Sequence, residues 1–262
     1  MAPLLQVMNM TKRFGGLVAV DNVSMDVNVG EVVGLVGDNG AGKSTLIKMV
    51  SGVYQPDGGQ IYFDGKPATF ASPREARDLG IETIYQDLAL AENLDVGSNI
   101  FLGRELKLPY LGGLVYTLDR NKMRDEAATV LSRLDIQIPS LTQQIRNLSG
   151  GQRQTVAITR AIYWNAKLMI MDEPTAALGV PEQRKLLALV RTLCGQGVPI
   201  IIISHNMQDV FAVADRIVVL RRGQKVGERM ATETTPDEIV SLMVGAETVH
   251  QMGIIPKPLN GA

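Results

Sequence analysis

The sequence lacks several features that define whole classes of protein. It has no run of about 18 apolar residues, roughly the length that a membrane-spanning helix needs. Its first residues, MAPLLQVMNMTKRF, lack the basic start, apolar run and cleavage site of an export signal. The single cysteine, Cys194, cannot form an internal disulfide, which is typical of a reducing compartment. We therefore expect a chain that is not exported and does not itself insert into a membrane.

An excess of charge of either sign is also missing. The 26 basic residues nearly balance the 27 acidic ones, so the formal net charge is −1. Because a surface that binds nucleic acid is usually strongly basic, the composition argues against a nucleic-acid partner. With 262 residues and 45% hydrophobic side chains, the chain can bury a substantial core, in one large or two small domains.

Strand-like patterns occur in two forms, and the first is alternation. Residues 4–29 contain stretches in which apolar and polar residues alternate, most clearly at Val23, Met25, Val27 and Val29. Such alternation is typical of strands with one buried face. The segment GQIYFDG at 59–65 indicates another short strand between glycines, and we expect the two regions to form an antiparallel layer.

The second form is the uninterrupted apolar run, typical of parallel strands buried on both faces. These runs are residues 31–36, 168–171 and 199–203. Between the last two, PEQRKLLALVRTLCGQG predicts a helix that starts near Pro181 and ends at Gly195 or Gly197. Its apolar face comprises Leu186, Leu187, Val190 and Leu193. Strand, helix and strand in this order form a βαβ unit, so the predicted fold class is α/β.

The middle of the chain has a different character. Residues 88–165 contain helical runs such as DRNKMRDEAATVLSRL and few strand-like stretches. We interpret this segment as a helical subdomain that interrupts a core with a mixed sheet. The core then comprises residues 1–87, with the antiparallel β layer, and residues 166–262. In the second part, RIVVLRRGQKVGERM predicts a hairpin that turns at 222–224, and the capping box TPDE at 235–238 predicts a final helix.

The first chemical motif is a glycine-rich loop. Residues 37–44 read GDNGAGKS and fit the phosphate-binding pattern G-x-x-x-x-G-K-[ST] at every fixed position. The loop follows the apolar run EVVGLV and precedes the helix-like STLIKMVSG, so its N–H groups can turn toward a phosphate chain. We expect Lys43 to reach the β- and γ-phosphates, Ser44 to bind Mg²⁺ and Thr45 to touch the α-phosphate. The residues expected to hold the nucleotide here are Gly37, Asn39, Gly40, Ala41, Gly42, Lys43, Ser44 and Thr45.

An acid pair follows the second apolar run. Asp172 and Glu173 come directly after LMIM, where that strand leaves the core. Functional groups gather at the carboxyl ends of such strands. Asp172 has the position of the acid that holds Mg²⁺ in P-loop NTPases, and Glu173 can polarise an attacking water. An acid pair alone is more often a solvated turn, but together with the phosphate loop it predicts nucleotide hydrolysis.

A second anion-binding helix start occurs at LSGGQ, residues 148–152. Ser149 can begin the helix that RQTVAITRAIYW continues, and the glycines expose its first N–H groups. We expect Ser149, Gly151 and Gln152 to contact a phosphate. Because the phosphate loop already accounts for one nucleotide, the motif raises the question of whose phosphate it binds.

The five residues LSGGQ resemble the signature sequence of ABC ATPases, and they follow that family's motif order. The resemblance implies an ABC-type nucleotide-binding domain of the P-loop NTPase class, with catalytic roles for Glu173, Lys43, Gln86 and His205. Gln86, after IETIY, matches the glutamine that senses Mg²⁺ and couples to membrane subunits. His205, after PIIIIS, matches the switch histidine that contacts the γ-phosphate. Phe14 in TKRFGG resembles the aromatic residue that stacks on adenine, with core packing as the alternative.

The chain departs from the family pattern at one position. After PTAAL the family usually has an aspartate that helps to arrange the dimer interface around the attacking water, and this chain has Gly179. The departure puts the coupling between the two sites in doubt and is compatible with a slower or more asymmetric ATPase. We still expect hydrolysis, because Glu173 and His205 are present. The other histidine, His250, is assigned no role.

The resemblance further implies a dimer in which each ATP lies between the phosphate loop of one cassette and the signature helix of its partner. Since the sequence has one copy of each motif, a homodimer is the simplest arrangement. Closure on ATP and opening on hydrolysis could drive alternating access in permease subunits that rest on the helical subdomain. Water would attack the γ-phosphate in line, with Glu173 as base and Lys43 among the groups that neutralise charge. The expected Mg²⁺ ligands are Ser44, Gln86 and Asp172.

The cargo is indicated by resemblance alone. YQDLALAENLDVGSNIFLGRE is similar to a segment of importers of simple sugars such as ribose, xylose and fructose. MDEPTAALGV and ISHNMQDVFAVADRIVVLRRGQ resemble the single-cassette, fructose-like members of that group. The expected partners are a second ATP-binding subunit, a transmembrane permease and an extracytoplasmic sugar-binding protein. The chain would then be peripheral at the cytoplasmic face of the inner membrane, held by the permease.

Three other functions share part of this motif pattern. An importer of another cargo, such as an amino acid, would use the same motor. A cytosolic ABC-type ATPase that acts on chromosomes or ribosomes should show long heptad arms or two cassettes with a basic linker, and neither occurs here. A P-loop kinase has no use for LSGGQ.

Overall fold

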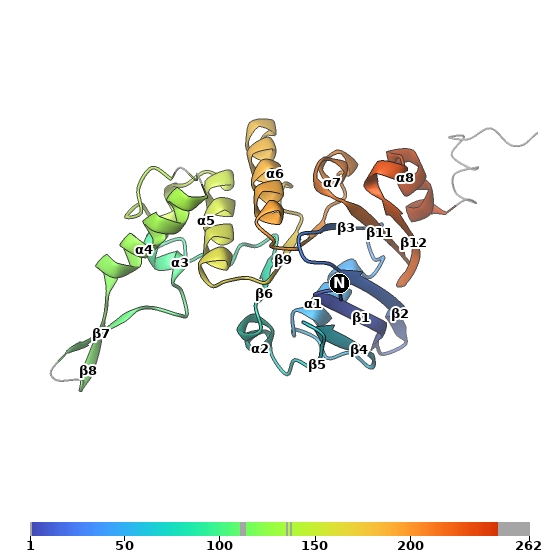
Figure 1. The fold of residues 1–262 in the computed structure, drawn as a ribbon, viewed down its shortest axis with the longest axis horizontal. Coiled ribbons are helices and arrows are strands. Elements are labelled where there is room, and N and C mark those ends of the chain that lie inside the picture. Colours follow the sequence, from blue (N-terminus) through green and yellow to red (C-terminus); the bar gives the residue numbers. More distant parts are fainter. Residues whose placement is uncertain (1, 111–113, 135, 137, 246–262) are drawn as a thin grey trace, which may run out of the picture.

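A six-stranded sheet forms the centre of the fold in the computed structural model, which describes residues 2–110, 114–134, 136 and 138–245 (Figure 1). The strand order is β12-β11-β3-β10-β9-β6. All neighbours pair in parallel except β11 and β12, which pair antiparallel. The strands are β3 (Val32–Val36), β6 (Ile81–Ile84), β9 (Leu168–Asp172), β10 (Ile200–Ile203), β11 (Arg216–Arg221) and β12 (Gln224–Met230). The three predicted apolar runs are thus the central strands β3, β9 and β10, and the mixed sheet is confirmed.

A four-stranded antiparallel sheet, with the order β2-β1-β4-β5, forms the predicted second layer. Its strands are β1 (Leu5–Phe14), β2 (Leu17–Val27), β4 (Gly58–Phe63) and β5 (Lys66–Ala68). The alternation prediction is confirmed for Val23, Met25 and Val27, which are at most 4% exposed. It is wrong for Val29, which is 62% exposed. The chain leaves β2 before Val29 and turns at Gly30, whose φ of +67° redirects it toward β3.

Helices flank the central sheet. They are α1 (Lys43–Val50), α2 (Pro73–Asp78), α6 (Val180–Gly195), α7 (Met207–Val213) and α8 (Pro236–Val244), with a short 3-10 turn, η3, at Ala231–Glu233. The helix predicted from Pro181 onward is α6, which ends at Gly195 as expected. Leu186, Val190 and Leu193 are buried, whereas Leu187 is half-buried. None of the helices in the described part of the chain is both long and apolar enough to cross a membrane.

The part of the core that follows α7 contains the predicted hairpin and helix. β11 and β12 are joined at Arg222 and Gly223, whose φ values of 49° and 81° are those of a tight hairpin turn. Helix α8 is capped by Thr235, whose hydroxyl accepts from the Glu238 N–H. Only this half of the predicted capping box forms. The Glu238 carboxylate instead accepts from Thr234 Oγ1 and Arg229 Nε, both 2.7 Å away.

Helices also dominate the segment between β6 and β9. They are α3 (Val96–Ile100), α4 (Arg120–Arg133), η2 (Ile145–Asn147) and α5 (Gly150–Tyr163). Their shared core includes Ile100, Phe101, Met123, Ile145 and Val156. The segment also holds a two-stranded hairpin, β7 (Lys107–Tyr110) with β8 (Val115–Leu118), which the sequence reading did not anticipate. Figure 1 shows this hairpin projecting away from the rest of the molecule. The subdomain boundaries at 88 and 165 stay a prediction.

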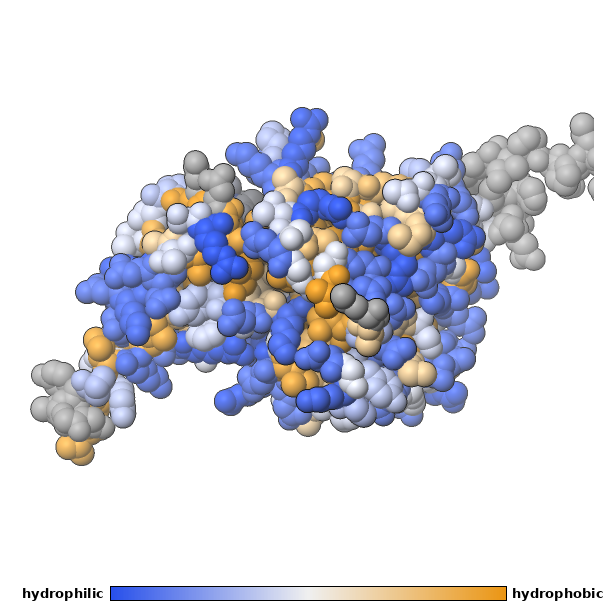
Figure 2. All heavy atoms as spheres, viewed as in Figure 1, coloured by the Kyte–Doolittle hydropathy of each residue, from blue (hydrophilic) through white to orange (hydrophobic). Residues whose placement is uncertain are grey.

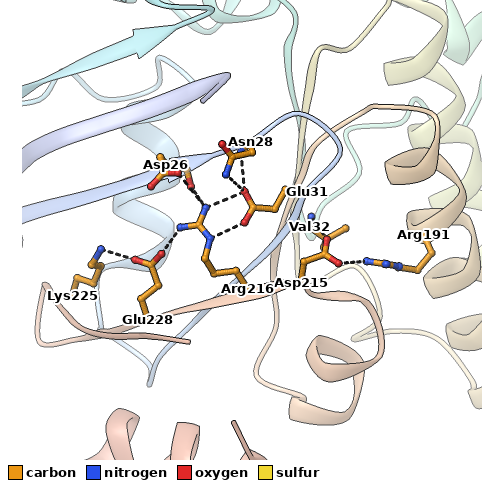
Figure 3. A network of polar contacts seen from close by, with 9 residues as sticks. All are labelled: Asp26, Asn28, Glu31, Val32, Arg191, Asp215, Arg216, Lys225 and Glu228. Atoms are coloured by element: carbon orange, nitrogen blue, oxygen red, sulfur yellow. Dashed lines mark hydrogen bonds and ion pairs between the residues drawn. The ribbon is translucent and has the colours of Figure 1, made fainter. Parts of the chain in front are cut away.

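A network of charged side chains ties the antiparallel layer to the central sheet (Figure 3). Arg216, at the start of β11, donates to Glu31 at 2.6 and 3.0 Å, to Asp26 and to Glu228. Its side chain is only 10% exposed. Asp26 belongs to β2, so the guanidinium joins residues about 190 positions apart in the chain. The hydrogen bonds and ion pairs raise the pKa of Arg216, which therefore stays charged.

Candidate functional site

The predicted phosphate loop connects β3 to α1 at the carboxyl end of a central strand. Its glycines are required because a side chain would collide with neighbouring atoms and because the backbone has a conformation that favours glycine. A Cβ atom at Gly37 would lie 2.3 Å from the Leu220 carbonyl oxygen, and one at Gly42 would lie 2.6 Å from that of Ala19. Gly42 has a φ of +101° and directly precedes the helix. The first N–H groups of α1 are therefore left facing the loop, as an anion site needs.

The β11–β12 turn is hydrogen-bonded to this loop. Gly223 N–H donates to the Ala41 carbonyl at 3.0 Å, and its own carbonyl accepts from Asp21 N–H at 2.8 Å. The hairpin predicted at the end of the core and the loop predicted near its start thus meet. Within the loop, Gly37 and Ala41 are buried, Gly42, Lys43 and Thr45 are half-buried, and Asn39, Gly40 and Ser44 are exposed.

Lys43 folds back over the loop. Its Nζ atom donates to the carbonyls of Gly37 at 2.6 Å and Asp38 at 3.0 Å. Burial lowers the pKa of Lys43, and the charges of Glu173 and Asp172 oppose this effect. Phosphate oxygens are stronger acceptors than neutral carbonyls, so a bound phosphate chain can replace these two contacts.

The acid pair lies where β9 ends. Asp172 is the last residue of that strand, and Glu173 N–H donates to the Ile203 carbonyl at 2.9 Å on the neighbouring strand β10. Glu173 has a φ of 51°, unusual for a residue other than glycine and commonly associated with functional strain of about 1–3 kcal/mol. Burial and the neighbouring charge of Glu173 raise the pKa of Asp172, whereas Lys43 and Lys48 oppose the rise.

His205 and Glu173 approach each other closely. The histidine follows β10, and its Nδ1 atom lies 2.8 Å from Oε2 of Glu173. The contact is poorly aligned, because this Oε2 atom accepts no hydrogen bond of normal geometry from the described residues. The glutamate side chain is 18% exposed and the histidine side chain 73%. The structure therefore brings together two groups that the sequence reading treated separately.

A cavity of about 260 Å³ lies between Glu173 and the start of α5. Gln86, Glu173, Gly150 and Gln154 are among the residues that line it. Gln154 is 5% exposed, and its amide nitrogen has no partner among the described residues. The sequence reading missed Gln154, because a glutamine on the buried side of an amphipathic helix carries no motif.

The LSGGQ segment forms the N-terminus of α5. Ser149 Oγ accepts from Gln152 N–H at 3.3 Å, and Gln152 Oε1 accepts from Ser149 N–H at 2.9 Å. This reciprocal pair is a complete capping box. Gly151 is needed because a Cβ there would lie 2.9 Å from the side chain of Glu182 in α6. Ser149 is exposed, so its helix start is open to a partner.

Phe14 lies at the end of β1, where it is 42% exposed. Its ring meets that of Tyr54 edge to face with centroids 5.3 Å apart, and Lys12 Nζ lies 5.6 Å from the ring centre. The alternative that Phe14 packs in the core is therefore wrong. The structure leaves the ring available to a planar ligand. Tyr54 was not identified from the sequence.

A buried hydrogen bond joins the segments that follow the two central strands. Thr175 Oγ1 donates to Asp209 Oδ2 at 2.6 Å, and both residues are at most 5% exposed. Thr175 lies two residues beyond Glu173, and Asp209 lies in α7, just after His205. Neither was predicted, since a Thr and an Asp 34 positions apart form no local pattern.

The donors near the acid pair suit a hard cation. The predicted ligands are a hydroxyl at Ser44, an amide at Gln86 and a carboxylate at Asp172, the oxygen ligands that Mg²⁺ prefers. Among the described residues, no group of three or more His, Cys, Asp and Glu side chains could hold a metal ion. A magnesium ion here would therefore depend on phosphate and water oxygens as well, as is common in nucleotide sites.

The sequence pattern of ABC transporters matches residues 20–176, which include the phosphate loop, the LSGGQ helix start and the acid pair. This chain belongs to the ABC transporter family. It is an ATP-binding and ATP-hydrolysing cassette of that family, and the α/β cassette fold expected from the sequence is confirmed.

Several known proteins align with almost the whole length of this chain. The xylose/arabinose import ATP-binding protein of Sulfolobus acidocaldarius is 49% identical over 243 residues, 93% of this chain and 94% of that protein. The fructose import ATP-binding protein of Rhizobium meliloti is 45% identical over 247 residues, 94% of this chain and 95% of that protein. A nucleotide-free ATP-binding cassette from an ABC transporter, known from a crystal structure, has a TM-score of 0.78 and 28% identity, with 98% of this chain and 100% of that chain covered.

Gly179, where the usual aspartate is missing, is the N-cap of α6 and has no side-chain cap. A Cβ atom there would lie 2.9 Å from Oε2 of Glu182, so a carboxylate from the first turn of α6 occupies this region. His250 lies outside the described residues.

Proposed function

We propose that this ATPase drives the import of a simple sugar through a separate membrane permease. The observation that carries the ATPase part of the proposal is that one chain presents two helix starts suited to an anion, at Lys43 and at Ser149. Among the described residues, Lys43 Nζ donates hydrogen bonds only to carbonyls of its own loop, and Ser149 caps its own helix while its N-terminus stays exposed. Two copies of the chain, arranged head to tail, would give each triphosphate one start of each kind.

The residues at the strand ends account for hydrolysis. Glu173 is the general base that takes a proton from the attacking water, and His205, 2.8 Å from it, orients that carboxylate or the γ-phosphate. Lys43 and the N–H groups at Ser149 and Gly151 stabilise the charge that develops on the phosphate. Phe14 holds the adenine ring through its exposed face. Mg²⁺ bound by Ser44, Gln86 and Asp172 would neutralise phosphate oxygens.

A groove beside the cavity is the proposed docking surface for the permease. It lies between α2 and the segment after β6, close to Gln86, and has a volume of about 690 Å³. Glu82 in this groove has a pKa raised by burial, with Arg104, Arg77 and Arg160 opposing the rise. Arg104 also stacks over Trp164 at 4.9 Å. A protein segment seated here would touch both the core and the helical region, so movement between them could be transmitted to it.

The groove can be tested by crosslinking in the assembled transporter. A Val53→Cys substitution introduces a thiol at an exposed residue that lines the groove, and Val29→Cys gives a matched exposed thiol elsewhere. We expect crosslinks to the permease from position 53 only. Equal crosslinking from both positions, or from position 29 alone, would place the permease elsewhere.

The sugar assignment rests on the relatives, which are named for the import of xylose, arabinose and fructose. The test is ATP hydrolysis by the complete complex with permease and extracytoplasmic binding protein. We expect a sugar-loaded binding protein to stimulate hydrolysis and an amino-acid-loaded one to have no effect. Stimulation by amino acids alone would keep the ATPase motor but replace the cargo.

A further inference from the structure

The β7–β8 hairpin has a surface that the ATPase chemistry does not use. Its strands pair only with each other in the described sheets, and the hairpin stands clear of the body of the molecule (Figure 1). An isolated two-stranded hairpin is at best marginally stable in water. A partner or a medium that covers the hairpin would therefore stabilise it.

Apolar side chains dominate this hairpin although water surrounds it. Between Glu105 and Asp119 the sequence has one charged residue, Lys107. The exposed apolar side chains are Leu108 at 47%, Leu114 at 88%, Val115 at 48%, Tyr116 at 61% and Leu118 at 46%. Figure 2 shows apolar surface at the protruding end of the molecule. Such a cluster usually marks a contact with a protein or a membrane.

The distribution over the two faces favours lipid over protein. Leu108 pairs with Thr117, so Leu108 and Val115 lie on one face of the ladder. Tyr116 and Leu118 lie on the opposite face. A protein groove would cover one face and leave the other in water. The interfacial zone of a bilayer surrounds an inserted hairpin on both faces.

The charges at the base of the hairpin fit an anionic lipid surface. Lys107, Arg120 and Lys122 are exposed, and none forms an ion pair with another described residue. Two acids lie nearby: Asp119 caps α4 by accepting from Lys122 N–H at 3.0 Å, and Glu105 accepts from Gly103 N–H at 3.0 Å. The three basic residues therefore outnumber the acids by one. Basic residues beside aliphatic and aromatic ones are typical of segments that bind at the membrane interface.

We infer that the β7–β8 hairpin inserts its exposed apolar side chains into the interfacial zone of a membrane rich in anionic lipid. The cassette would then have a lipid contact of its own, beside its contact with the permease, which departs from the expectation that the chain does not itself insert into a membrane. This inference goes beyond the proposed transport function, since vesicle binding can be measured with the cassette alone. Failure of the sugar assignment would leave it untouched.

The test is sedimentation of the purified full chain with phosphatidylcholine vesicles, with or without about one quarter phosphatidylglycerol. The hairpin variant carries Leu114→Ser and Tyr116→Ser. The control variant carries Leu17→Ser and Val29→Ser, at residues that are 66% and 62% exposed on other parts of the surface. We expect the wild type and the control to bind anionic vesicles, and the hairpin variant to bind about fivefold less or worse. Melting curves of all three proteins confirm folding.

Two further arms separate the apolar and the charged contributions. Lys107→Gln with Lys122→Gln should weaken binding to anionic vesicles by a few fold, and added salt should have a similar effect on the wild type. Equal sedimentation of the wild type and the hairpin variant would overturn the inference, as would failure of the wild type to bind any vesicle. If the hairpin variant instead bound vesicles normally but lost ATPase coupling to the permease, the hairpin would be a protein contact and the inference wrong.

Discussion

Nδ1 of His205 lies 2.8 Å from Oε2 of Glu173, so the proposed switch histidine contacts the proposed catalytic carboxylate. The two residues follow adjacent parallel strands, β10 and β9, which brings their backbones close together. The imidazole is largely exposed and can therefore move, whereas Glu173 is held in a left-handed backbone conformation. We expect Glu173 to be the fixed member of the pair and His205 to exchange its contact for the γ-phosphate.

Glu173→Gln should separate nucleotide binding from turnover. The substitution keeps the size and polarity of the side chain but removes the base, so hydrolysis should fall by about 100-fold or more. ATP binding should persist, and a dimer held by uncleaved ATP should accumulate. Phosphate release measures the first effect, and light scattering with Mg·ATP measures the second. Wild-type turnover in this variant would show that another group activates the water.

Thr175→Val should destabilise the cassette without changing its surface. The side chains have similar shape, but the Asp209 carboxylate would lose its 2.6 Å donor in a buried setting. We expect the free energy of unfolding to fall by about 1–3 kcal/mol, as urea titration would measure. Thr175→Ser keeps the hydroxyl and is the control. Equal loss in both variants would point to packing of the methyl group as the cause.

Much of the fold could be predicted because its signals are local. The apolar runs of β3, β9 and β10 and the glycine pattern of the phosphate loop can be recognised within a few residues each. The β7–β8 hairpin could not, because Pro109 interrupts the first strand and exposed apolar residues resemble part of a buried helix. Whether this segment forms a hairpin depends on contacts in space, which the sequence alone does not show.

The candidate site was predictable residue by residue, but its arrangement was not. Lys43, Asp172 and Glu173 belong to motifs whose spacing reflects the chemistry. Glu173 meets His205 only when distant segments are brought together. The same holds for the buried amide of Gln154, whose nitrogen has no hydrogen-bond partner among the described residues. The same is true of Arg216, whose partners lie up to 190 positions away.

Arg216→Met should be among the more destabilising single changes in this chain. It would leave the Glu31 carboxylate without its cation and Glu228 with Lys225 alone, and breaking a buried pair such as Arg216–Glu31 costs about 3–5 kcal/mol. Arg229→Met is the control, because its pair with Glu238 is 41% exposed on both sides and should contribute less than about 1 kcal/mol. Urea unfolding of both variants gives the comparison. Similar losses would mean that the network in Figure 3 adds little.

The same network predicts an acid limb in the stability of the wild type. Burial opposes the shifts, but hydrogen bonds and charge lower both pKa values from 4.5: through Arg216 and Asn28 for Glu31, and through Lys225 and Arg216 for Glu228. Groups with a depressed folded-state pKa stabilise fully above the unfolded value, and this stabilisation is lost as the pH falls below 4.5 toward the folded values. Unfolding measured across this range should show the loss, and Arg216→Met should flatten it. An unchanged slope in the variant would assign the acid limb to other carboxylates.

Glu182 is the residue best placed to compensate for Gly179. Its Oε2 atom lies 2.9 Å from the point where a side chain at position 179 would begin, and its aliphatic part packs over Gly151 of the signature. A carboxylate is therefore present near the expected dimer interface although the usual aspartate is not. If Glu182 does arrange that interface, Glu182→Gln should lower ATP turnover in the assembled transporter by up to about tenfold, since small displacements around the attacking water are costly.

The decisive comparison is a rescue. Adding Gly179→Asp to Glu182→Gln returns a carboxylate to the usual position, and it should restore turnover because the like-charge contact with Glu182 has been removed. Gly179→Asp alone, in the wild-type background, should slow turnover, because the new carboxylate and that of Glu182 would repel each other at close range. Gly179→Ala beside Glu182→Gln controls for the added Cβ atom. If the alanine rescues as well as the aspartate, backbone stiffness at the start of α6 matters rather than charge.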